Sequence, residues 1–149
     1  MKKRIAMLGT LFVLLCSATF ANATNDNINQ KVLAAFTAQF TSAKEVSWNR
    51  TEKYIKATFT INDQSMFAYF YESGELIGIS RNIAVSQLPI NLGTSLKDYK
   101  ATGWVSELFE FAGDGETNYF ATIESGREKV MIKSLGDNSW TVYKKIKKH

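Results

Sequence analysis

The sequence is poor in the residues on which many active sites depend. It contains a single cysteine, Cys16, and a single histidine, His149, which is also its last residue. A Ser-His-Asp triad or a histidine-based metal site therefore lacks its central residue. Cys16 lies in a stretch that we expect to be removed on export. The rest of the chain then has no disulfide and must be stabilised by packing of its core.

The sequence also lacks the patterns that bind phosphate or calcium. There is no glycine-rich phosphate loop, and Asp114-Gly115-Glu116 lacks the repeated acid spacing of a calcium loop. The other acidic residues fall mostly in predicted turns and at strand edges, and nothing selects two of them as a pair for glycoside hydrolysis. We therefore expect no enzyme, and no catalytic, cofactor-binding or metal-ligating residue. The acidic residues considered are Glu107, Glu110, Asp114, Glu116, Glu124, Glu128 and Asp137.

The first 23 residues have the pattern of a signal peptide. Three basic residues at positions 2–4 precede an apolar run over residues 5–15, which is too short to span a membrane. Small residues follow, and Ala21-Asn22-Ala23 matches the usual cleavage pattern. We expect Sec-type export with cleavage after Ala23, or after Ala21. This leaves residues 24–149 as one periplasmic or secreted domain that does not span the membrane.

Removal of this leader changes the charge of the protein. The full chain has 18 basic and 14 acidic residues and a net charge of +4. Without the three basic residues at positions 2–4 the balance is 15 to 14, so the net charge becomes +1. This balance does not favour a nucleic-acid partner. Four lysines near the end of the chain are expected to form a solvated terminus. They are Lys144, Lys145, Lys147 and Lys148.

Residues 54–81 predict three antiparallel strands in a row. In residues 54–61, Tyr, Lys and Thr alternate with Ile, Ala and Phe, and in residues 66–71, Met, Ala and Phe alternate with Phe and Tyr. Such alternation is typical of half-buried strands. The turns at 62–64 and 72–75 contain Asn, Asp and Gly, which tolerate a positive φ. The rest of the chain either covers this meander or repeats it.

A helix precedes the meander, and further strands lie on both sides of it. Apolar residues at three- and four-residue spacing indicate an amphipathic helix over residues 28–40, with Asn27 or Asn29 as its N-cap. The same pattern of apolar and aromatic residues between turns predicts five more strands. Their ranges are 45–48, 104–111, 118–124, 129–134 and 139–145.

A second helix begins the second of two similar halves. It is expected over residues 90–99 with Pro89 at its first turn, or from Thr94 onward. Each half then consists of a helix followed by four strands. This order predicts an internal duplication, with repeats of about 28–82 and 88–146.

Several of these segments together resemble a known family. They are a helix that ends in AAFTAQF, followed by KEVSW, YIKATF, a strand running into ESGELIGISR and a single LP before a helix. In these segments the chain resembles the PepSY-like, β-lactamase-inhibitor-like proteins of Gram-negative periplasms. The similarity covers nearly all of the chain after the leader. It implies an α+β fold in which tandem helix-plus-four-strand repeats form an antiparallel sheet, with helices on one face and an open, concave opposite face. The matching positions belong to core, turns and caps, so the resemblance supplies no catalytic residue.

The strand alternation predicts which face of the sheet binds a partner. We expect Phe59 and Phe70 to be buried under the first helix, near Phe36 and Phe40. The residues that alternate with Phe59 and Phe70 along the two strands then face away from the helices. The two tyrosines of strand 66–71 should therefore be accessible. Exposed aromatic residues beside threonine and lysine are typical of binding surfaces. The candidate binding face consists of Tyr54, Lys56, Thr58, Phe67, Tyr69 and Tyr71.

Two functions from different classes agree with this pattern. The first is a non-enzymatic binding module that uses the open sheet face to inhibit or modulate a protein partner. The second is a carrier or sensor of a small apolar or peptide-like ligand. The pattern is equally compatible with a face that binds nothing, because a loop could cover it or its aromatic residues could serve cross-strand packing alone.

Overall fold

A computed structural model describes residues 27–136 and 138–148 of the chain. The predicted leader and its cleavage sites lie outside these residues, and so do Asp137 and His149. The described chain forms one sheet of eight strands that follow each other in sequence order, with every neighbouring pair antiparallel. The strands are β1 (Lys44–Arg50), β2 (Ile55–Ile61), β3 (Gln64–Phe70), β4 (Leu76–Asn82), β5 (Trp104–Gly113), β6 (Glu116–Glu124), β7 (Glu128–Leu135) and β8 (Ser139–Lys147).

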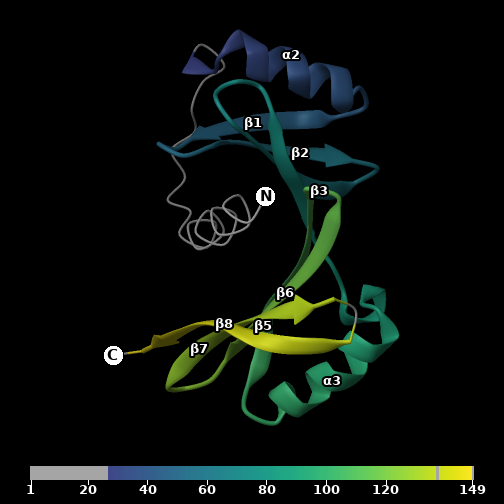
Figure 1. Cartoon of the computed structure of the whole chain (residues 1–149), viewed down its shortest axis with the longest axis vertical. Coiled ribbons are helices and arrows are strands. Elements are labelled where there is room, and N and C mark those ends of the chain that lie inside the picture. The colour runs from purple at the N-terminus through teal and green to yellow at the C-terminus, as the bar shows by residue number, and fades with distance from the viewer. Residues whose placement is uncertain (1–26, 137, 149) are drawn as a thin grey trace.

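The sheet is strongly curved, and both long helices lie on its convex side (Figure 1). Helix α2 (Gln30–Gln39) packs on β1 to β3, and helix α3 (Ile90–Lys100) packs on the second half of the sheet. A short 3-10 helix, η3 (Val85–Gln87), precedes α3. The predicted α+β class, with an antiparallel sheet and helices on one face, is confirmed.

Helix α2 begins at Gln30, two residues after the start of the predicted range. The Asn29 side chain accepts a hydrogen bond from the backbone N–H of Lys31 at 2.9 Å, so Asn29 and not Asn27 is the N-cap. The apolar stripe of the helix buries Phe36, whose ring centroid lies 5.0 Å from that of Phe59 and 6.4 Å from that of Phe70. The predicted burial of Phe59 and Phe70 under this helix is confirmed, since both are 1% exposed or less.

Helix α3 begins at Ile90, directly after Pro89, and not at the alternative start Thr94. Leu92 and Leu96 are fully buried against the sheet. The Trp140 side chain of β8 reaches back to the helix, where its Nε1–H donates a hydrogen bond of 3.0 Å to the Leu92 carbonyl. The apolar residue Ile90 does not share in this packing. Ile90 is 86% exposed because it is the first helical residue and lies beyond the sheet contact.

The two halves of the sheet meet between β4 and β5. Residues 79–82 pair with residues 109–112, and Arg81 forms an ion pair with Glu110 across this ladder. Gly78 lies close to the same junction, and a Cβ atom there would come within 2.7 Å of the Ala112 carbonyl oxygen. Each half has the predicted order of a helix followed by four strands. The origin of that order in a duplication stays a prediction.

Candidate functional site

The concave side of the sheet carries a continuous cluster of aromatic residues. It is distinct from the two clusters under α2 and α3, and both halves of the chain contribute to it. We call this cluster the concave aromatic face; Phe67, Phe109 and Tyr143 are its partly exposed members, and the other six are buried. Its members are Tyr54, Phe67, Tyr69, Ile77, Phe109, Phe111, Phe120, Met131 and Tyr143.

The register of β2 and β3 places four of the six candidate residues on this side. Thr58 pairs with Phe67, and Lys56 pairs with Tyr69. Directly opposite residues of an antiparallel ladder point to the same face, so all four lie together. Tyr71, just beyond β3, is 36% exposed, as predicted.

The predicted accessibility of Tyr69 is wrong. Its exposed fraction is 4%, and that of Tyr54 is 5%. The Tyr69 ring packs against the rings of Tyr54 and Phe111, with centroid distances of 5.7 and 6.0 Å. Its hydroxyl oxygen lies 3.3 Å from the Ser80 Oγ atom. Single-strand alternation gives the direction of a side chain, whereas burial depends on partners from β4 and β5 that the curvature brings close.

Six of the nine residues of the concave aromatic face were not selected by the sequence analysis. Phe109 stacks on Phe120 with a centroid distance of 5.3 Å and an interplanar angle of 9°. Tyr143 meets the Phe120 ring edge-on at 5.8 Å. The alternation of Phe109 and Phe111 within residues 104–111 is the same period-two signal used for the first meander. Applying it to the second half would have identified these residues.

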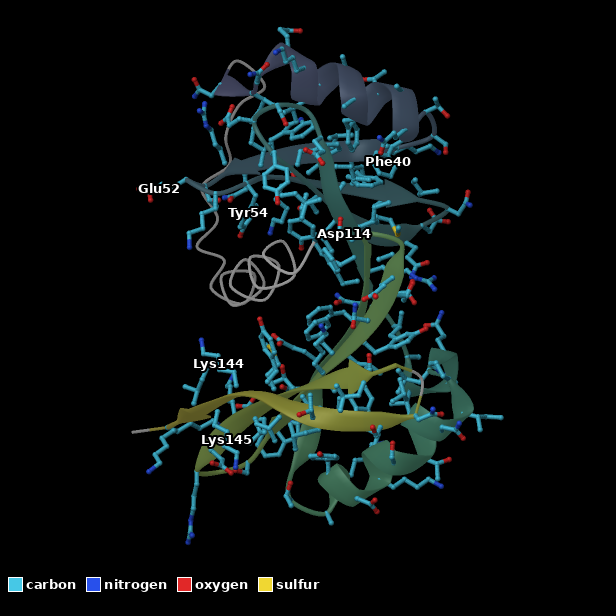
Figure 2. The ribbon with its side chains drawn as sticks, in the orientation of Figure 1. Phe40, Glu52, Tyr54, Asp114, Lys144 and Lys145 are labelled. Atoms are coloured by element: carbon cyan, nitrogen blue, oxygen red, sulfur yellow. The ribbon has the colours of Figure 1, made fainter. Side chains whose placement is uncertain are left out.

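Three lysines of the concave side have no acidic partner among the residues that the structure describes. The Lys56 Nζ atom lies 5.6 Å above the Phe67 ring, and the Lys133 Nζ atom lies 5.7 Å above the Phe120 ring. Burial lowers the pKa of Lys56 because it removes water from the charged form. Lys144 pairs with Met131 of the concave aromatic face, whereas Lys145 pairs with Val130 under α3. Figure 2 shows Lys144 and Lys145 on opposite sides of β8.

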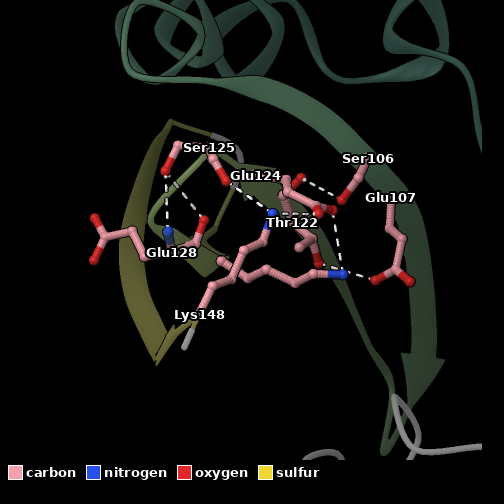
Figure 3. Close-up of polar contacts among 8 residues, drawn as sticks. Ser106, Glu107, Thr122, Glu124, Ser125, Glu128 and Lys148 are labelled. Atoms are coloured by element: carbon pink, nitrogen blue, oxygen red, sulfur yellow. Dashed lines mark hydrogen bonds and ion pairs between the residues drawn. The ribbon is translucent and has the colours of Figure 1, made fainter.

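A network of polar contacts ties the end of β8 to the turn between β6 and β7 (Figure 3). The Glu124 carboxylate forms ion pairs with Lys148 at 2.7 Å and with Lys129 at 3.2 Å. The Lys148 ammonium also donates a hydrogen bond of 2.8 Å to the Ser125 carbonyl and lies 5.5 Å from the centre of the Trp104 ring. The lysine tail, predicted to be a solvated terminus, is therefore anchored at Lys148.

The network predicts a pH-dependent contribution to stability. The hydrogen bond from Lys148, and then the contacts with Lys129, lower the pKa of Glu124. A carboxyl whose pKa is lowered by folding stabilises the protein above its unfolded pKa of about 4.3, and this contribution disappears as the pH falls through the folded pKa. We expect Glu124→Gln to lower the thermal unfolding midpoint at neutral pH, with the difference from wild type vanishing in acid below the folded pKa.

The measurement is circular dichroism during heating over a series of pH values. Glu128→Gln is the matched control, because the Glu128 carboxylate in the same turn forms no ion pair in the described part of the chain. A midpoint difference for Glu124→Gln that stays constant with pH would contradict the proposed role of the ion pairs.

Among the described residues, the acidic residues considered as catalytic candidates have separate partners. Glu110 is paired with Arg81, Glu124 with two lysines, and Glu107 accepts a hydrogen bond of 3.0 Å from the Thr122 hydroxyl. Within residues 27–136 and 138–148, no group of three or more His, Cys, Asp or Glu side chains is placed to hold a metal ion. None of the described helices is long and apolar enough to cross a membrane.

Solved structures with the same arrangement of sheet and helices are BLIP-like proteins and proteins of the DUF2874 family. The crystal structure of a BLIP-like protein from Bacteroides fragilis NCTC 9343 has a TM-score of 0.70 and 14% sequence identity, and covers 82% of this chain and 89% of that chain. The fold is similar to that of the BLIP-like proteins. Identity this low supports a similarity of fold alone, so the BLIP-like fold assigns no activity.

Two further structures share the BLIP-like fold. A DUF2874 family protein from Bacteroides ovatus ATCC 8483 has a TM-score of 0.71 at 13% identity, over 83% of this chain and 89% of that chain. A candidate periplasmic protein from Bacteroides eggerthii DSM 20697 has a TM-score of 0.71 at 13% identity, over 80% and 88%. No protein-family model and no curated protein sequence matches the chain. The PepSY-like part of the predicted resemblance therefore stays a prediction.

Proposed function

We propose that this protein is a non-enzymatic periplasmic binding module that inhibits or modulates a protein partner through its concave side. The observation that carries the proposal is the placement of both helices on the convex side, so that aromatic rings and lysines from both halves gather on the other side. The described structures with a similar fold include a candidate periplasmic protein, which supports the compartment. The fold alone does not support inhibition of any particular enzyme.

The charges of the concave side indicate the chemistry of the partner. Lys56, Lys133 and Lys144 are half-buried on this side and lack acidic partners among the described residues. A partly desolvated ammonium gains more from a carboxylate than a fully solvated one does, because the effective dielectric constant is lower. A partner surface with acidic residues around an apolar centre would therefore match this side best.

The test is a pull-down from a periplasmic extract with the purified protein as bait. Lys144→Glu should lose the partner that wild type captures, because it reverses a charge on the concave side. Lys145→Glu is the matched control, since it makes the same change at the neighbouring position on the opposite side of β8. Equal capture by wild type and Lys144→Glu would exclude the concave side as the binding surface.

The same preparation distinguishes the second function, a carrier of a small apolar or peptide-like ligand. Native mass spectrometry of protein purified from its own periplasm reports any copurifying small molecule. A bound small molecule without a protein partner would support the carrier. A mass equal to that of the chain alone, together with a protein captured in a Lys144-dependent manner, supports the binding module.

A further inference from the structure

A second surface lies outside the concave aromatic face, where the segment before α3 meets the start of β5. It is a groove of about 640 Å³. One wall is formed by the segment around Val85, and the other by the first residues of β5, including Trp104 and Glu107. Lys100, the last residue of α3, also lines the groove. Apolar and polar side chains therefore share one groove. Glu107 pairs with Thr122, which pairs with Met131 of the concave aromatic face, so this part of the groove borders that face.

Trp104 is the aromatic platform of this groove. It is 55% exposed, whereas the other two tryptophans, Trp48 and Trp140, are 4% and 7% exposed. Tryptophan is enriched at binding surfaces because it combines a large apolar area with one hydrogen-bond donor. The cation of Lys148 lies 5.5 Å from the centre of the indole ring, and Lys148 is itself held by Glu124. The network of Figure 3 therefore restrains the orientation of the ring before any ligand arrives.

The polar groups of the groove are partly unused. The Glu107 Oε2 atom accepts a hydrogen bond of 3.0 Å from Thr122, which orients the carboxylate and leaves Oε1 as an acceptor. Lys100 forms no ion pair within the described residues, so its ammonium is a donor. Ser106 also lines the groove, and its hydroxyl donates a hydrogen bond of 3.4 Å to the Thr122 carbonyl. One carboxylate and one ammonium give the lining no net charge, which does not favour an ion of either sign.

From this arrangement we propose that the groove binds a neutral saccharide. A sugar ring has an apolar face of C–H groups that can lie on the Trp104 indole, and hydroxyl groups that both donate and accept. The hydroxyls can donate hydrogen bonds to the Glu107 carboxylate and accept hydrogen bonds from the Lys100 ammonium. A purely apolar ligand would remove water from both charged groups without replacing their hydrogen bonds, which costs free energy. The groove contains none of the lysines on which the protein-binding proposal depends, so Trp104→Ala and Lys144→Glu test the two proposals separately.

The test uses the exposure of Trp104 as a reporter. Acrylamide quenching of tryptophan fluorescence is measured on the purified protein, alone and with cellobiose, maltose or N,N′-diacetylchitobiose. Since Trp48 and Trp140 are buried, the quenchable emission comes from Trp104. We expect at least one disaccharide to reduce quenching and to shift the emission to shorter wavelength. No protection by any of the three sugars would overturn the proposal.

Saturation-transfer NMR on variants distinguishes disaccharide binding in the groove from non-specific binding elsewhere on the protein. Trp104→Ala should weaken disaccharide binding about tenfold or more, because the stacking surface is lost. Tyr71→Ala removes an exposed aromatic residue elsewhere and should bind like wild type. Glu107→Gln should weaken binding less than Glu107→Ala. Unchanged binding by Trp104→Ala, or protection of Trp104 by glycylglycine but by no sugar, would show that the site is not a saccharide site.

Discussion

Replacing Phe59 by Ala is expected to lower the free energy of unfolding by about 3–5 kcal/mol. Phe59 is 1% exposed, and its ring contacts those of Phe36 and Phe40 with centroid distances of 5.0 and 4.8 Å. Truncation removes these contacts and leaves a cavity between α2 and the sheet, which the helix can close only in part. The whole domain is expected to have a stability of about 5–15 kcal/mol, so the loss is a large part of it.

Urea denaturation followed by circular dichroism measures this loss, with a lower midpoint and an unchanged slope. Phe59→Leu should cost on the order of 1.5 kcal/mol or less, because most of the volume is retained. Tyr71→Ala is the surface control and should change stability by about 0.5 kcal/mol at most. A larger loss for Tyr71→Ala than for Phe59→Ala would mean that the faces of β2 and β3 are assigned the wrong way round.

Replacing Trp140 by Ala should destabilise the other half of the protein by a similar amount, about 3–5 kcal/mol. Trp140 is 7% exposed and packs in the cluster under α3 with Leu92 and Leu96. Its Nε1–H also donates the hydrogen bond to the Leu92 carbonyl, which attaches β8 to the helix. The substitution therefore removes both the packing and the polar contact between the last strand and α3.

Trp140→Phe separates these two contributions, since it keeps a ring but loses the donor. Its expected cost is about 0.5–1.5 kcal/mol for the hydrogen bond, plus a small packing loss. Trp104→Ala is the matched tryptophan control on the surface, with an expected change of about 0.5 kcal/mol at most. A cost for Trp140→Ala no greater than that of Trp104→Ala would contradict the burial of Trp140 in the core.

The losses in unfolding free energy caused by Phe59→Ala and Trp140→Ala should be additive. Phe59 and Trp140 lie in separate clusters with no residue in common. Substitutions at distant sites without shared partners usually add to within about 0.5 kcal/mol. If the double variant loses much less than the sum, one half has already unfolded in the single variant.

On the concave side, residue patterns predicted the direction of side chains but not their burial. The alternation in residues 66–71 was sufficient to place Phe67 and Tyr69 opposite the helices, because the direction of a side chain in a strand is a local property. The burial of Tyr69 against Phe111 was not accessible in this way. These two residues are separated by the whole of α3 in the sequence, and only the curvature and the β4–β5 pairing bring them together.

The Trp104 groove was not predicted at all. Its lining combines the segment around Val85, the end of α3 and the start of β5, and no motif connects these segments. Lys148 belonged, in the sequence analysis, to a terminus expected to be solvated. Its contacts with Glu124 and Trp104 exist because β8 pairs with β7 and so returns the end of the chain to the β6–β7 turn.

By itself, the sequence determined the class of the protein, an α+β chain, and the approximate positions of its helices, strands and turns from local periodicity. It left two choices open, Asn27 or Asn29 as the first N-cap and residue 90 or Thr94 as the start of the second helix, and the structure selects Asn29 and Ile90. These are short-range effects, because a cap or an alternating strand depends on neighbours a few residues away. Tertiary structure alone decided which aromatic residues are covered, which lysines lack partners and where the Trp104 groove lies. Those properties depend on residues from distant strands that meet only when the sheet curves, and no pattern of period two or 3.6 contains that information.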